Sequence, residues 1–179
     1  IPAEGAHQSA SLASASPVTD GKHVFFYFGS MGLYCVSPEG ELVWEKKLGQ
    51  MQTKHGHGEG SSPALCDQTI IVNWDHENQS YIMALDTRTG REKWKFDRPE
   101  VTSWSSPIVI SVDGKRQVVV AGTSRVRGYD FLTGRELWQC GGLSANVVAL
   151  GRNQTTFHIT TTNQSAVRAK THDFISHDY

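Results

Sequence analysis

A nine-residue motif that occurs twice in the chain constrains the fold more than any other feature. The motif reads Asp, two variable residues, Thr-Gly, three variable residues and Trp. It occupies residues 86–94 and again residues 130–138, which lie 44 residues further on. A weaker copy with Gly40 and Trp44 lies 50 residues before the middle copy. Similarity at a spacing of this size is typical of repeat architectures, so the chain is predicted to consist of copies of one structural unit.

A second marker has nearly the same spacing. The dipeptide Ser-Pro occurs at residues 16–17, 62–63 and 106–107, at intervals of 46 and 44 residues. Each Ser-Pro is followed by an apolar run, a turn and a β-branched run. Two independent markers with one period indicate three units.

Each unit contains four short runs rich in Val, Ile, Tyr and Phe, with turn residues between them, which is a pattern typical of strands. The predicted strands are 15–18, 23–29, 32–37 and 42–46 in the first unit, 61–66, 69–74, 81–86 and 92–96 in the second, and 105–111, 117–122, 125–130 and 136–140 in the third. Units of four strands that repeat every ~40–50 residues are typical of propeller blades. The sequence therefore predicts an all-β fold, a β-propeller arc of about three to four four-stranded antiparallel blades.

The predicted domain organisation follows from these units. Residues 1–13 form an N-terminal segment, and residues 14–149 hold the blades. The units span about 14–48, 60–97 and 104–140, and a fourth unit starts at 141–149. Residues 150–179 are an atypical tail, because they lack Ser-Pro, a Thr-Gly turn and a tryptophan. Two interpretations of the tail stay open: a shifted reading frame, or an extension that is disordered in isolation.

The length of the chain predicts that it is part of a longer propeller. Closing a propeller of this repeat type, which removes its sheet edges, takes roughly six to eight blades. The chain has 179 residues, which is too short for that number at the observed spacing. We therefore expect an incomplete propeller that requires its missing blades.

The repeated motif has a structural explanation. Asp86 and Asp130 are expected to accept hydrogen bonds from backbone N–H groups of the turn, and Gly90 and Gly134 to adopt the positive φ with which the turn ends. The tryptophan of each copy then lies on the outermost strand, where its ring can pack against the next blade and its N–H can reach a carbonyl. The motif tryptophans are Trp44, Trp94 and Trp138.

Composition excludes several classes of function. The chain has 17 Lys and Arg against 18 Asp and Glu, which gives no electrostatic reason to bind nucleic acid or an anionic membrane. No apolar run approaches the ~18 residues of a transmembrane helix. Cys35, Cys66 and Cys140 are too scattered for a disulfide framework or a zinc site. No Ser-His-Asp or phosphate-loop pattern is present.

The longer loops are predicted to share one face. In a four-stranded antiparallel blade, the loop into the first strand and the loop between the second and third strands open on the same side. These loops span 49–60, 74–80, 97–104 and 122–125, and we call this side the loop-rich face. Because function concentrates on loops held by a rigid scaffold, this face is the candidate binding face. Its candidate residues are His55, His57, Glu59, Trp74, Asp75, His76, Glu77, Trp104 and Arg125.

Alternatives stay open for several of these side chains. His55 and His57, with Glu59 or His76, either share a metal or belong to a solvated glycine-rich loop. Trp74 and Trp104 either line the mouth of the channel or pack inside blades. Arg125 and Arg127 either bind an anion or form rim salt bridges. The sequence predicts neither a catalytic residue nor a metal site.

The motif in its context resembles the PQQ-like β-propeller repeat of bacterial proteins. The resemblance covers about residues 14–149 and includes the stretches GEGSSPAL, NWDHE and SRVRGYD. It implies a propeller fold and a location outside the cytoplasm, either periplasmic or secreted. The family includes dehydrogenases that depend on pyrroloquinoline quinone and non-enzymatic propellers of outer-membrane assembly.

The resemblance is weaker for activity than for fold. Dehydrogenases of this kind have two adjacent cysteines beside the quinone, and they bind calcium through Glu, Asn and Asp side chains from separate blades. This chain has no adjacent cysteines, and Asn73, Asp75 and Glu77 come from one short segment. We therefore predict a non-catalytic propeller scaffold that binds an unknown small molecule or protein. A fragment of a quinone-dependent dehydrogenase and a structural module of outer-membrane assembly are the alternatives; pyrroloquinoline quinone as a cofactor is implied by the resemblance alone.

Overall fold

The computed structural model describes residues 13–141, residues 8, 11 and 143, and the backbone of 148–153, 156–160 and 166–170. Most of the predicted N-terminal segment at 1–13 and much of the predicted tail at 150–179 lie outside these residues. The proposed domain boundaries therefore stay predictions.

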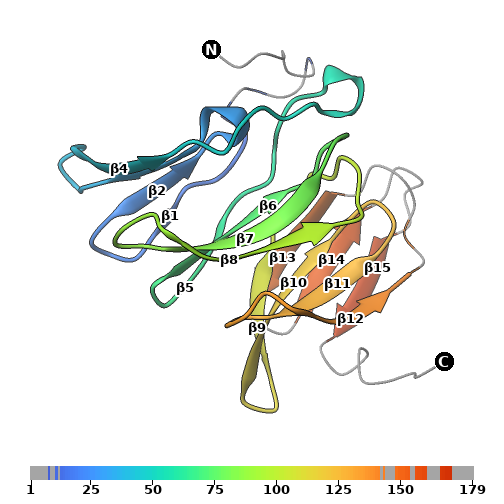
Figure 1. Cartoon of the computed structure of the whole chain (residues 1–179). Helices are drawn as coiled ribbons and strands as arrows, with labels where there is room; N and C mark the ends of the chain where they lie inside the picture. Colours follow the sequence, from blue (N-terminus) through green and yellow to red (C-terminus); the bar gives the residue numbers. More distant parts are fainter. Residues whose placement is uncertain are drawn as a thin grey trace.

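Three four-stranded antiparallel sheets follow one another along the chain (Figure 1). Blade 1 contains β1 (Val18–Thr19), β2 (Val24–Tyr27), β3 (Leu33–Val36) and β4 (Leu42–Lys46). Blade 2 contains β5 (Ala64–Cys66), β6 (Thr69–Trp74), β7 (Ser80–Asp86) and β8 (Glu92–Arg98). Blade 3 contains β9 (Ile108–Val112), β10 (Lys115–Ala121), β11 (Val126–Asp130) and β12 (Glu136–Cys140).

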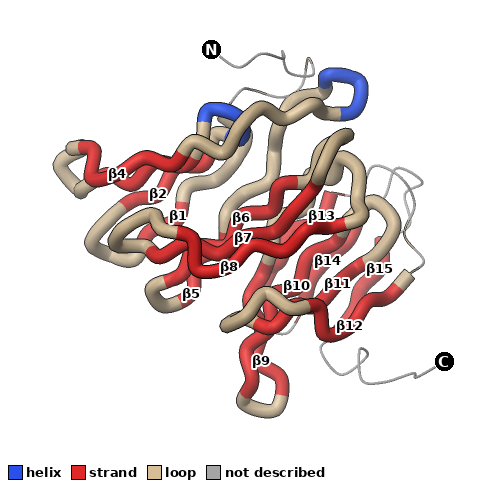
Figure 2. Tube along the Cα trace, in the orientation of Figure 1, coloured by secondary structure: helices blue, strands red, loops and turns tan. Residues whose placement is uncertain are grey.

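The predicted fold is confirmed. Within each blade the strands pair in chain order, as a meander, and none of these sheets closes into a barrel. In the described part of the chain the helical segments are two single 3₁₀ turns, η1 (Gly29–Met31) and η2 (Lys54–Gly56), and Figure 2 shows strands and loops everywhere else. The result is an incomplete β-propeller of about three blades, as the repeat spacing predicts.

A further sheet follows blade 3. It contains β13 (Val148–Asn153), β14 (Thr156–Thr160) and β15 (Ala166–Lys170), paired antiparallel in that order. β13 contacts β10, so this sheet lies on the side of blade 3 that faces away from blade 2.

Blade 2 is buried on both sides, which explains its nearly continuous apolar strands. Side chains of a strand point alternately to opposite faces of the sheet. Ile70 and Val72 of β6 therefore pack against blade 1, whereas Ile71 between them packs against blade 3. A strand covered on both faces needs apolar residues at successive positions, and all six residues of β6 are buried.

The motif tryptophans join consecutive blades. Trp44 of blade 1 donates its Nε1–H to the carbonyl of Thr87 in blade 2, at 2.9 Å, and Trp94 of blade 2 donates to the carbonyl of Phe131 in blade 3, at 3.0 Å. Each ring lies on the glycine of the next Thr-Gly turn. A Cβ on Gly90 would lie 2.7 Å from the ring of Trp44, and a Cβ on Gly134 would lie 2.3 Å from the ring of Trp94. Glycine is required there for both its positive φ and its small size.

The aspartate of the motif holds the turn in shape. Asp86 Oδ1 accepts hydrogen bonds from the backbone N–H of Arg88, at 3.1 Å, and from that of Thr89, at 3.0 Å. Asp130 Oδ1 makes the same contacts with Leu132 and Thr133, at 3.0 and 2.8 Å. Burial opposes ionisation of both carboxyl groups, but these hydrogen bonds, together with those from the Thr89 and Thr133 hydroxyls, lower the pKa of Asp86 and of Asp130.

The Ser-Pro marker occupies the inner rim of the arc. The first strands of consecutive blades are neighbours, since β1 contacts β5 and β5 contacts β9. Beside them, the backbone N–H of Ser16 donates to Ser62 Oγ at 2.9 Å, and that of Ser62 donates to Ser106 Oγ at 2.9 Å. One hydrogen bond between equivalent serines is thus repeated at each step from blade to blade.

Candidate functional site

The loops of the loop-rich face are joined by hydrogen bonds. The backbone N–H of Lys54 donates to Thr102 Oγ1 at 2.9 Å, and Thr102 Oγ1 donates to Glu77 Oε1 at 2.6 Å. Thr123 Oγ1 donates to the carbonyl of Thr102 at 2.7 Å. Thr102 therefore connects loops from all three blades, as the strand order requires. That this face binds a ligand or partner stays a prediction.

A buried ion pair lies beneath the loops of this face. Asp75 and Arg98 are each 2% exposed. Arg98 Nε donates to Asp75 Oδ1 at 2.8 Å, and Arg98 Nη2 donates to Oδ2 at 3.1 Å, so the pair is bidentate. Ser103 Oγ and Asn73 Nδ2 also donate to Asp75 Oδ2, at 2.6 and 3.2 Å. Both carboxylate oxygens of Asp75 are thus occupied by donors of the protein itself.

The same network extends into blade 3 through Tyr129. Arg98 Nη1 donates to the Tyr129 hydroxyl at 2.6 Å. Burial lowers the pKa of Arg98, but the charge of Asp75, the hydrogen bond to it, and the neighbouring Tyr129 and Glu100 together outweigh burial and leave the pKa above its usual value. Burial also raises the pKa of Tyr129 to about 12, so this hydroxyl stays protonated. The Arg98 guanidinium and the Tyr129 hydroxyl therefore both keep their protons near neutral pH.

A second buried ion pair lies near the first, because Glu100 acts on Arg98 and Arg127 on Tyr129. Arg127 Nη1 donates to Glu100 Oε1, and Ser124 donates to the same carboxylate through its hydroxyl, at 2.7 Å, and its backbone N–H, at 2.9 Å. Burial opposes ionisation of Glu100, yet the hydrogen bonds from Arg127 and Ser124 outweigh it and lower the pKa of the carboxyl. Arg127 was expected either to bind an anion or to form a salt bridge on the rim. The structure shows a salt bridge, and it is buried. Arg125 is exposed.

The predicted histidines fall into two environments. His76 is buried; its Nδ1 accepts the backbone N–H of Gln52 at 3.2 Å, and its Nε2 lies 3.1 Å from the carbonyl of Gln79. Both ring nitrogens therefore hold the loops. His55 is exposed, and the centroid of its ring lies 5.4 Å from that of His57. Among the described residues, no group of three or more His, Cys, Asp or Glu side chains is arranged to hold a metal ion.

The two tryptophans of the predicted face also separate. Trp74 is 2% exposed and stacks on Tyr81, with ring centroids 5.5 Å apart, so it packs inside the core between blades 1 and 2. Trp104 is half-buried on the face, where it stacks against His57 and donates its Nε1–H to the carbonyl of Gly58 at 2.9 Å. The structure thus places Trp74 in the core between two blades and Trp104 on the surface.

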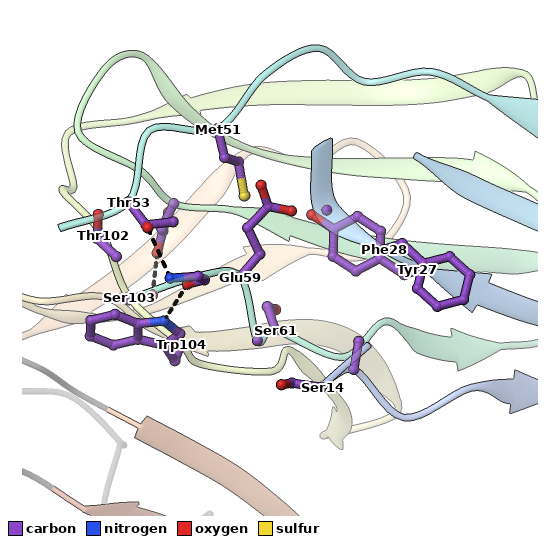
Figure 3. A pocket seen from close by; sticks show the side chains of 15 residues that line it. Ser14, Tyr27, Phe28, Met51, Thr53, Glu59, Ser61, Thr102, Ser103 and Trp104 are labelled. Atoms are coloured by element: carbon purple, nitrogen blue, oxygen red, sulfur yellow. Dashed lines mark hydrogen bonds between the residues drawn. The ribbon is translucent and has the colours of Figure 1, made fainter. Parts of the chain in front are cut away.

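A pocket opens between blades 1 and 2 on this face (Figure 3). The space that the centre of a water-sized sphere can reach inside it is about 10 Å³, which is room for about one water molecule. Three of the predicted residues line it, Glu59, Asp75 and Trp104. Glu59 accepts hydrogen bonds from the backbone N–H of Ser30, at 2.5 Å, and from the Ser30 hydroxyl. The other lining residues include Ser14, Tyr27, Phe28, Met51, Thr53, Ser61, Thr102 and Ser103.

Sequence reasoning missed several residues of this region. Arg98, Glu100, Ser103, Tyr27 and Tyr129 were assigned no role there, although each one lines the pocket or belongs to a buried pair. One signal was present in the sequence: the charged residues Arg98 and Glu100 interrupt the strand pattern where β8 ends. A charge that is buried at a strand end needs a partner of opposite charge.

The residues present do not fit a quinone and calcium site. The oxygens of Asp75 are held by Arg98 and Ser103, and Glu77 bonds to Thr102, so these carboxylates are engaged within the protein. Cys35, Cys66 and Cys140 are free and lie in three different blades. Burial raises the pKa of the Cys35 thiol to about 11, which leaves it a protonated, unreactive group.

A comparison with protein families identifies the repeat. The family model described as outer membrane protein assembly factor BamB matches residues 3–172. The chain belongs to this family. A search of curated proteins gives no match. In the described part of the chain, no helix has the length and apolar character to cross a membrane.

Solved structures share the fold of this BamB family member. The designed protein Ika4 is 14% identical with a TM-score of 0.62, and the match covers 92% of each chain. The quinohemoprotein alcohol dehydrogenase from Comamonas testosteroni is 12% identical with a TM-score of 0.63, covering 92% of this chain and 36% of that one. BamB from Moraxella catarrhalis is 14% identical with a TM-score of 0.53, covering 88% and 53%. The chain therefore spans about half the length of that BamB, and these likenesses show the fold alone.

Proposed function

We propose that the protein is a non-catalytic propeller module that binds its partner, a small molecule or a protein, on the loop-rich face. The observation that carries this proposal is the pairing of the buried charges under that face. Asp75 is neutralised by Arg98, and Glu100 by Arg127. A general base or a nucleophile needs a reactive group that can reach substrate, whereas these pairs stiffen the loops and present a fixed surface. Membership of the BamB family supports a propeller module.

The alternative is a piece of a quinone-dependent dehydrogenase, and enzymology separates the two. We expect the purified protein to show no quinone-dependent oxidation of alcohols or sugars, and calorimetry with pyrroloquinoline quinone and calcium to give no saturable heat. The reason is that the carboxylates in question are engaged by Arg98, Ser103 and Thr102. A calcium-dependent quinone complex of about micromolar affinity, which corresponds to about 8 kcal/mol, would overturn the proposal.

We also propose that blade 1 requires a further blade of the same repeat on its outer side. Gly90 and Gly134 each lie under a tryptophan of the preceding blade, but among the described residues nothing lies within 4 Å of a Cβ placed on Gly40. The outer side of blade 1 carries half-buried aromatic rings. Phe28 stacks on Phe26 at 6.2 Å and contacts Tyr34 at 6.1 Å, between centroids. Another blade would cover these rings and bring a tryptophan onto Gly40.

The open side of blade 1 can be measured with an apolar dye. The chain by itself is expected to bind 8-anilinonaphthalene-1-sulfonate, because contiguous exposed apolar surface is available to the dye. The double substitution Phe26→Ser and Tyr34→Ser should reduce the fluorescence, whereas Leu137→Ser on β12, which removes an exposed side chain from a different blade, should not. Equal fluorescence of both variants would contradict an open apolar side on blade 1.

We place the protein outside the cytoplasm, in the periplasm or secreted. The family description, an outer membrane assembly factor, supports this location. Cell fractionation with compartment markers tests it, and recovery in the cytoplasmic fraction would contradict it.

A further inference from the structure

One buried hydroxyl at the pocket has no partner among the described residues. Tyr27 is 3% exposed, and its hydroxyl makes no hydrogen bond within the described part of the chain. Figure 3 shows this hydroxyl directed into the hollow between blades 1 and 2, toward the side chain of Glu59. Buried polar groups are nearly always hydrogen-bonded, to the protein or to ordered water, and an unpaired one destabilises the fold. The Tyr27 hydroxyl therefore requires a partner inside the hollow.

The size of the hollow limits what this partner can be. The centre of a water-sized sphere can reach about 10 Å³ of it, which is room for about one water molecule. A buried water is held where it has about two to four polar partners. The wall of the hollow supplies polar groups of this kind, because the hydroxyl of Ser61 and the carboxylates of Glu59 and Asp75 line it together with Tyr27.

The donors and acceptors of the hollow also match water. Burial raises the pKa of Tyr27, so the hydroxyl keeps its proton and can donate it. The Ser61 hydroxyl already donates to the carbonyl of Ser105 at 2.8 Å, so toward the hollow it can only accept. A partner that accepts from Tyr27 and donates to Ser61 satisfies both sides. Water does both, whereas an ammonium ion has no acceptor and a metal ion has no donor.

From these observations we infer that one ordered water molecule is bound in the hollow, where it accepts a hydrogen bond from Tyr27 and donates to acceptors on the blade 2 side, Ser61 among them. Tyr27 is the last residue of β2 in blade 1, and Ser61 precedes β5 of blade 2. The water therefore joins two blades that are joined directly elsewhere, through Trp44 and Ser16. The inference does not depend on the partner of the loop-rich face, because it concerns the contact between two blades.

Magnetic relaxation dispersion of ¹⁷O tests this inference, because it counts the water molecules that are held long enough to tumble with the protein. Tyr27→Phe removes the group that holds the water on the blade 1 side. The number of long-lived waters should therefore fall by about one relative to the unsubstituted chain, which is the capacity of the hollow.

Tyr34→Phe is the matched control. It also removes a tyrosine hydroxyl of blade 1, but this hydroxyl donates to the carbonyl of Met31 at 2.8 Å and lies outside the pocket. The control should leave the number of long-lived waters unchanged. It should raise the equilibrium constant of unfolding about fivefold, the usual effect of losing one hydrogen bond, and urea denaturation measures this change in both variants.

An unchanged number of long-lived waters in Tyr27→Phe would overturn the inference, and the stability of that variant would then identify the reason. An unfolding constant that rises about fivefold would show that Tyr27 bonds directly to a protein group, and one that is unchanged or lower would show that the hydroxyl has no partner. Loss of a water in both Tyr27→Phe and Tyr34→Phe would also overturn it, because the loss would then not depend on the hollow.

Discussion

Replacing Trp94 by alanine is expected to lower the free energy of unfolding by about 3–5 kcal/mol, the range for truncating a buried aromatic side chain. The ring is 8% exposed and packs in the core between blades 2 and 3. Its N–H also satisfies the carbonyl of Phe131. The substitution leaves a cavity above Gly134 and an unpaired carbonyl, and each of these lowers the free energy of unfolding. Urea denaturation followed by circular dichroism measures the loss.

Trp138→Ala is the matched control for that experiment. Trp138 has the same place in the motif, but it is half-buried, its ring lies over Gly128 of its own blade, and its Nε1–H donates to Gln117 Oε1 at 2.7 Å. Its removal should cost clearly less than that of Trp94. Equal losses would show that the contact with the next turn contributes nothing.

Replacing Arg98 by methionine is expected to destabilise the fold by about 3–5 kcal/mol, because it leaves the carboxylate of Asp75 buried without its counter-charge. The double variant Arg98→Met and Asp75→Leu should recover most of that loss, since a well-packed apolar pair is often as stable as a buried ion pair. Denaturation of the two single variants and the double variant gives the coupling energy directly.

An exposed ion pair provides the comparison. Arg116 Nη1 contacts Asp67 Oδ2 at the surface, and exposed pairs contribute roughly 0–1 kcal/mol. Arg116→Met should therefore change stability little. If Arg98→Met were equally mild, the buried network of Asp75 would not be what holds the loop-rich face in place.

The fold was predictable because its signals are local and repeated. A turn made by Asp86 and Gly90 is encoded within five residues, and the strands around it show their own apolar runs. The spacing between copies then fixes the number of units without any knowledge of contacts. Trp44 illustrates the limit of this reasoning: its partner carbonyl belongs to Thr87, 43 residues away, and only the repeat places the two together.

The chemistry of the candidate site was less predictable, because it depends on contacts between unlike positions. Asp75 pairs with Arg98 and Glu100 with Arg127, at separations of 23 and 27 residues that match no repeat. A single sequence does not reveal which polar side chains are buried or what they contact. His76 therefore looks like a metal ligand in the sequence, although both its ring nitrogens contact backbone groups of the loops. Tyr27 is indistinguishable in sequence from an ordinary apolar position of an alternating strand.

The serines at the inner rim have a consequence for how such a chain changes in length. Each blade receives the N–H of the preceding serine and offers its own to the following one, as Ser62 does between Ser16 and Ser106. A gene duplication or deletion that copies or removes one whole unit therefore carries matching donor and acceptor with it, and both new junctions are already compatible. An insertion of any other length would separate the serine N–H donor of one blade from the serine acceptor of the next. Selection on such a gene can therefore change the number of blades one at a time, and the residues that join neighbouring blades stay the same.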